Sequence, residues 1–142
     1  MRILGIDAGQ RRVGLAISDP SATLARPLMT LHVTNAAEAV DRIAAEVTRL
    51  AAEDDGLAAI VVGMPARLDG SPTTHTPAVI ALVEALKQRT PVRVVTEGER
   101  LTSREAESQL ALREPDWRKR KAQLDAVAAA IILQDYLDRR PT

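Results

Sequence analysis

Short apolar runs and longer amphipathic stretches follow one another along the chain, a pattern typical of a mixed α/β protein. Five strands are predicted, at residues 2–7, 13–18, 25–33, 57–65 and 92–95. The first two are joined by the polar stretch AGQRR, which indicates a tight antiparallel connection. Pro27 favours a sheet edge for the third strand, because proline has no N–H to donate. The uninterrupted apolar run of the fourth is typical of a strand covered on both faces in a parallel sheet.

Amphipathic stretches between the later strands predict helices. Asn35 and Glu38 form a capping box, which marks a helix start. Apolar residues then recur with helical spacing to about residue 53, at Val40, Ile43, Val47 and Leu50. A second helix is predicted at about residues 77–87.

Two more helices are predicted towards the C-terminus. Thr102 and Glu105 make a second capping box, for a helix that runs to about Leu112. A basic connector, REPDWRKRK, then leads to a last helix whose first turn contains Asp125. The apolar face of this helix is formed by Leu124, Val127, Ala128, Ile131 and Leu137. The order of elements predicts one domain, residues 1–142, with a mixed five-stranded sheet and helices on both of its faces.

Composition narrows the classes of function. Nineteen basic and nineteen acidic residues cancel, so any attraction to nucleic acid depends on a local patch. The chain has no cysteine, which excludes disulfides and thiolate metal sites. Trp117 and Tyr136 are its only aromatic residues, which disfavours a platform that stacks bases. No signal-peptide or membrane-span pattern occurs, so we expect a cytoplasmic protein without a membrane partner.

Three acids stand where the backbone pattern changes. Asp7 ends the first strand, Glu99 follows the last strand, and Asp125 opens the last helix. Acids that converge at the carboxyl ends of strands would form an oxygen-rich site suited to Mg²⁺ or Mn²⁺. Each also has a simpler explanation: Asp7 as a cap for the turn at Gly9, and the other two as acids near helix N-termini. Spacing alone leaves both explanations open.

Four collinear segments carry a family resemblance. They are GIDAGQRRVGLAISDP, IVVGMPARLDGS, ERLTSREAESQL and LDAVAAAIILQDYLD, which together cover nearly the whole chain. They resemble the YqgF/RuvX family of pre-16S rRNA nucleases, also described as Holliday-junction-resolvase-like. The first segment has the family's Asp, Gly, basic pair and second Gly at Asp7, Gly9, Arg11–Arg12 and Gly14.

The resemblance implies an RNase H-like fold and a metal-dependent nuclease that processes the 5′ end of pre-16S rRNA during ribosome biogenesis. Asp7, Glu99 and Asp125 then match the family's catalytic, metal-binding acids, and the cofactor is Mg²⁺ or Mn²⁺. Where the family reads Asp-Glu-Arg, this chain reads Gly98-Glu99-Arg100, so one acid is missing. If Glu99 is the ligand the chemistry survives, and Glu97 would help only if the strand stays extended.

Basic residues and glycines beside these acids are candidates for substrate binding. Arg11, Arg12 and Arg100 suit phosphodiester oxygens, which guanidinium groups bind in a bidentate manner. The alternative is an internal ion pair between such an arginine and an aspartate. Gly9 would let a ligand approach the backbone, or simply serve the turn. Arg118, Lys119 and Lys121, in the run RKRK, add charges that bind a phosphate backbone, or form an ordinary solvated surface.

Three other functions remain open at this stage. A D-x-G sequence also begins the phosphate loop of actin-like ATPases, although that architecture needs two such domains. Gly98 is compatible with a non-catalytic protein that binds RNA or Holliday junctions through an eroded site. A DNA junction resolvase is the third alternative, for which a homodimer would suit a four-way junction, but the pattern does not distinguish a monomer from a homodimer.

Overall fold

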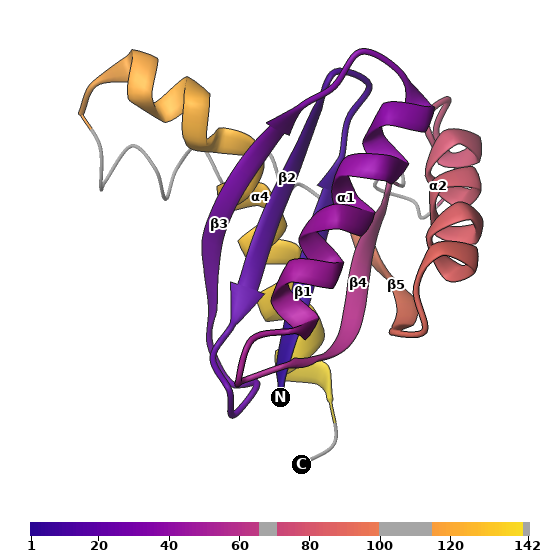
Figure 1. Cartoon of the computed structure of the whole chain (residues 1–142). Coiled ribbons are helices and arrows are strands. Elements are labelled where there is room, and N and C mark those ends of the chain that lie inside the picture. Colours follow the sequence, from indigo (N-terminus) through magenta and orange to yellow (C-terminus); the bar gives the residue numbers. More distant parts are fainter. Residues whose placement is uncertain (66–70, 100–114, 141–142) are drawn as a thin grey trace.

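The computed structural model describes residues 1–65, 71–99 and 115–140, except for the side chains at positions 99, 117 and 120–122 (Figure 1). Its strands are β1 (Arg2–Ala8), β2 (Arg12–Ser18), β3 (Ala25–His32), β4 (Leu57–Pro65) and β5 (Arg93–Glu99). Its helices are α1 (Ala36–Ala51), α2 (Thr76–Arg89) and α4 (Trp117–Arg139). The predicted helix at 102–112 lies outside the described residues.

The strands form one mixed sheet in the order β3-β2-β1-β4-β5. β1 pairs antiparallel with β2, and β2 antiparallel with β3, whereas β4 is parallel to both β1 and β5. Pro27 lies on the edge strand β3, where its missing N–H costs no central hydrogen bond. The predicted mixed five-stranded sheet is therefore confirmed.

Helices cover both faces of this sheet, with α1 and α2 on one face and α4 on the other (Figure 1). Alternation along β1 explains the two layers. Leu4 and Ile6 are fully buried in the core beneath α1 and α2, and Ile3 packs in the core beneath α4. β4 contributes to both cores, as expected for a strand covered on both faces.

The capping box of α1 is confirmed, with a change of partner. The Glu38 N–H donates to the Asn35 Oδ1 at 2.8 Å, as predicted. The Glu38 carboxylate accepts from the N–H and hydroxyl of Thr34 instead of from the Asn35 N–H, and these hydrogen bonds lower its pKa below the ordinary value. On the same helix, Ile43, Val47 and Leu50 are buried, which confirms the predicted apolar stripe.

α4 starts earlier than predicted. Asp116 is its N-cap and accepts from the Arg118 N–H at 2.9 Å, so the helix begins at Trp117. The basic run at 118–121 therefore belongs to the helix and is not a connector. Asp125 lies about two turns inside α4, and its predicted place in the first turn was wrong.

The buried surface of α4 is wider than the predicted stripe. Residues Val127, Ala128, Ile131 and Leu137 are buried as expected. Ala129, Ile132 and Leu133, which the prediction omitted, pack against the sheet. In the described part of the chain, no helix is both long and apolar enough to cross a lipid bilayer.

Candidate active site

Glycines in β1 and β2 let α4 lie very close to the sheet. A Cβ built on Gly5 would be 2.7 Å from the Cβ of Leu133, and one on Gly14 would be 1.9 Å from the backbone oxygen of Asp125. No real Cβ makes contacts this short, so both positions require glycine unless the helix moves. The two glycines thus fix the height of α4 above β1 and β2.

Gly14 also connects the first and last predicted acids. Gly14 and Asp7 are directly opposite each other in the β1–β2 ladder, and opposite residues of an antiparallel pair project to the same face. The missing Cβ of Gly14 points at Asp125, so Asp7 lies on the α4 face beside Asp125. The structure therefore brings these two predicted acids together at one end of the sheet.

Asp125 has an unusual environment. Its side chain is 22% exposed, and its Oδ2 is buried and has no hydrogen bond with the described residues. The Arg12 Nε lies 3.1 Å from this oxygen, within ion-pair distance, although the N–H is not directed at it as a hydrogen bond requires. The alternative of an internal ion pair is thus what the structure shows for Arg12. The carboxylate is balanced in charge but keeps lone pairs for another partner.

The third predicted acid, Glu99, is the last residue of β5. The prediction that it follows the strand was wrong. Its register partner is Pro65, and its side chain is outside the described set. No group of three acids or histidines that could hold a metal ion occurs among the described residues. The three-acid centre therefore remains a prediction, and the structure shows only that Asp7 and Asp125 share one face of the sheet.

Glu97 and Gly98, which precede Glu99 in β5, differ in their surroundings. Glu97 is only 8% exposed, and its carboxylate accepts from the Arg139 guanidinium at the far end of α4. A buried acid with a partner in α4 was not anticipated, because nothing near Glu97 in the sequence indicates it. A Cβ on Gly98 would meet no atom of the described residues within 4 Å, so these residues leave room for the aspartate that the family resemblance implies at this position.

The predicted phosphate-binding residues are partly described. The Gly9 N–H donates to the Arg12 carbonyl at 2.8 Å and closes the turn between β1 and β2. A Cβ on Gly9 would lie 2.8 Å from that same oxygen, so glycine is needed for the turn itself. Arg11 is exposed in this turn, and Arg118 and Lys119 are exposed in the first turn of α4, which extends past the sheet (Figure 1). Arg100 and the Lys121 side chain lie outside the described residues.

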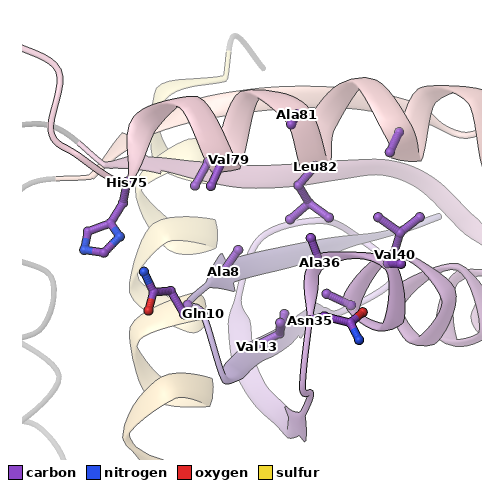
Figure 2. Close-up of a pocket in the computed structure, with 15 residues that line it drawn as sticks. Ala8, Gln10, Val13, Asn35, Ala36, Val40, His75, Val79, Ala81 and Leu82 are labelled. Atoms are coloured by element: carbon purple, nitrogen blue, oxygen red, sulfur yellow. The ribbon is translucent and has the colours of Figure 1, made fainter.

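A separate groove of about 500 Å³ lies between α1 and α2 (Figure 2). Its walls are mostly alanines and valines, with Gln10, Asn35 and His75 as polar residues. Ala8 and Val13, which line it, point to the α1 and α2 face of the sheet. The groove is therefore on the opposite face from Asp7 and Asp125, and it contains none of the predicted acids.

Comparisons with known proteins identify the family of this chain. The chain matches the RuvX family, described as a Holliday junction resolvase, over residues 1–139. A Chloroflexus aggregans protein named "Putative pre-16S rRNA nuclease" is 43% identical over 138 residues, 97% of this chain and 94% of that protein. A protein of the same name from Anaeromyxobacter dehalogenans is 40% identical over 140 residues, 99% of this chain and 98% of that protein.

Solved structures support the predicted fold. RuvC from Thermus thermophilus superposes with a TM-score of 0.55 at 20% identity, covering 96% of this chain and 94% of that chain. The same protein in complex with a Holliday junction substrate gives a TM-score of 0.52 at 21% identity, over 96% of this chain and 93% of that chain. The RuvC-like, RNase H-like fold is confirmed, and the family match over residues 1–139 shows that this chain belongs to the RuvX (YqgF) family.

Proposed function

We propose that this protein is a metal-dependent nuclease that hydrolyses phosphodiester bonds in structured RNA, in 5′-end processing of pre-16S rRNA. The observation that carries this proposal is the buried Oδ2 of Asp125, which accepts no hydrogen bond from the part of the chain that the structure describes and lies on the same face as Asp7. The names of the relatives supply the substrate.

The described acids fit a hard divalent cation. Mg²⁺ and Mn²⁺ prefer carboxylate oxygens and often use only one or two carboxylates, together with water and phosphate oxygens. Asp7 and Asp125 offer such oxygens, and Glu99 ends β5, the strand two places from β1. When bound, the ion would polarise the phosphate and provide an activated water for its hydrolysis.

The remaining residues bind and orient the substrate. Arg11 and Arg12 lie in the turn beside the acids, where guanidinium groups bind phosphate oxygens and balance charge that develops on them. Arg118 and Lys119 extend this basic surface along the first turn of α4. Because such contacts go to the backbone, they position a nucleic acid without reading its sequence.

Gly98 favours one alternative, a protein that binds RNA or junctions but no longer cleaves them. In that case the acids would serve binding alone, and neither the wild type nor a variant that lacks one of the acids would cleave RNA. A second alternative is that the substrate is branched DNA. The cleavage assay described next includes a DNA junction for this reason.

The test is cleavage of a pre-16S rRNA 5′ fragment, and in parallel of a four-way DNA junction, with Mn²⁺, Mg²⁺ or EDTA. We expect metal-dependent cleavage of the RNA, and a loss of about 100-fold or more in Asp7→Asn and Asp125→Asn, since even one oxyanion donor is worth that much. Binding of the RNA should persist in both variants. RNA binding without metal-dependent cleavage would instead identify the non-catalytic binder, and cleavage of the junction alone would identify a resolvase.

A further inference from the structure

We propose that Arg12 and the divalent cation are alternative partners of Asp125. In the metal-free protein the guanidinium balances the carboxylate, and cation binding releases Arg12 to bind substrate phosphate. This inference rests on the proposed metal site and adds a residue that couples metal binding to substrate binding.

The contact between Arg12 and Asp125 is suited to exchange. The Asp125 oxygen is buried, and a charge withdrawn from water requires a nearby cation. Arg12 supplies that cation at 3.1 Å, but without the aligned hydrogen bonds that make arginine–carboxylate pairs strong. A divalent ion that reaches the same oxygen therefore displaces a weak partner.

Arg12 can leave without disturbing the fold. Its backbone is fixed by the Gly9 N–H and by pairing with His32 in the β2–β3 ladder, and neither interaction involves its side chain. The Arg12 side chain is 44% exposed, so the guanidinium borders solvent from which a phosphate would arrive. The strand thus holds a guanidinium next to the acids that can exchange Asp125 for a phosphate without a change of backbone.

Electrostatics makes the two partners exclusive. A guanidinium and a divalent ion at one carboxylate oxygen repel each other at short range. By linkage, if the cation weakens the Arg12–Asp125 contact, Arg12 must weaken cation binding by the same factor. Removing Arg12 should therefore strengthen metal binding while it weakens phosphate binding, which a purely structural ion pair would not do.

The first experiment is calorimetric titration of Mn²⁺ into the full chain, for the wild type, Arg12→Ala, Arg11→Ala and Asp125→Asn. We expect Arg12→Ala to bind Mn²⁺ about 2- to 5-fold more tightly than the wild type, the range that a partly exposed ion pair allows. Arg11→Ala is the matched control, since it removes a neighbouring exposed guanidinium, and it should change affinity less than about 2-fold. In Asp125→Asn the additional Arg12→Ala change should give no gain.

The second experiment measures affinity for a short RNA duplex in EDTA and in saturating Mn²⁺, before cleavage proceeds. The wild type should gain more affinity from Mn²⁺ than Arg12→Ala does, because only the wild type has a guanidinium to release.

The outcomes separate the two proposals. Equal or weaker Mn²⁺ binding by Arg12→Ala, or the same gain in RNA affinity for both proteins, would overturn the exchange while leaving the metal site intact. No Mn²⁺ binding by any variant would overturn the metal site itself, and the exchange with it. Thermal melting of each variant establishes that it is folded.

Discussion

Gly14 shapes the candidate site although it has no side chain. It sits opposite Asp7 in the sheet and leaves the space that the Asp125 backbone occupies. A side chain at this position would push α4 away and separate the two acids. The glycine at this position of the first family segment is therefore required by packing against α4. It lies inside β2, so turn geometry does not explain it.

We expect Gly14→Ala to destabilise the protein by about 1–3 kcal/mol, as overpacking does, and to weaken Mn²⁺ binding. Gly98→Ala is the matched control, because its new Cβ would have no described atom within 4 Å. Chemical denaturation and Mn²⁺ titration of both variants provide the measurements. Equal stability of the two alanine variants would show that α4 does not need Gly14.

The open space at Gly98 allows a gain of function. Gly98→Asp supplies the carboxylate that the family usually has, and the nearby negative charge should strengthen Mn²⁺ binding and raise the rate of RNA cleavage. Gly98→Asn, of the same size but uncharged, is the control. If the aspartate and asparagine variants bind Mn²⁺ equally and cleave at the same rate, then this position contributes nothing to the site.

At the scale of the elements, the strands and α1 follow from periodicity because their apolar residues face a core. The start of α4 does not follow, because its first two turns carry the basic run and extend past the sheet, with no apolar stripe to detect. The signal available was Asp116, an N-cap residue directly before the run.

The end of β5 was missed for a related reason. Its last residues, Thr96-Glu97-Gly98-Glu99, read as a loop because they are polar and contain a glycine. Their backbone nevertheless continues the parallel ladder with β4 up to Pro65. Polar strand ends are expected where a sheet carries a site, and this is where local patterns fail as predictors.

Asp19, in the connection between β2 and β3, makes the stability of the fold depend on pH. The Asp19 carboxylate accepts from the Ser21 hydroxyl and from the N–H groups of Thr23 and Leu24, at 2.8 and 2.9 Å for the latter two. The hydrogen bond from Ser21, followed by those from Leu24 and Thr23, lowers the pKa of Asp19 to about 2. These bonds also hold the loop that contains Ala22, whose φ is 56°.

A lowered pKa means that the folded state favours the ionised acid. The stabilisation is complete above the ordinary pKa of 3.8 and is lost as the pH falls towards about 2. We therefore expect Asp19→Asn to melt at a lower temperature than the wild type at neutral pH, and the difference to shrink between about pH 4 and pH 2. Thermal melts across this range measure it, with Asp54→Asn, in the α1–β4 connection, as the control. A difference that does not depend on pH would contradict this account.

At the scale of the whole molecule, the two faces of the sheet have separate roles. The face under α1 and α2 holds the larger apolar core, while the face under α4 combines a second core with the acids at its end. Sequence periodicity predicted these layers, but it could not predict that Arg12 contacts Asp125, because that contact depends on how closely α4 approaches the sheet.

The balance of charge over the whole chain makes nucleic-acid binding a local property. Formal charges cancel, so attraction to RNA must come from a local basic patch, in which each phosphate contact releases counterions. We expect the affinity for an RNA duplex to fall steeply as the salt concentration rises. Arg118→Ala and Lys119→Ala should each remove one phosphate contact and so reduce the magnitude of the slope of log affinity against log salt by about 1. Lys87→Ala is the control, since Lys87 lies in the last turn of α2 and pairs with Glu84. Unchanged slopes in the α4 variants, or an equal reduction in Lys87→Ala, would show that the first turn of α4 does not contact the RNA.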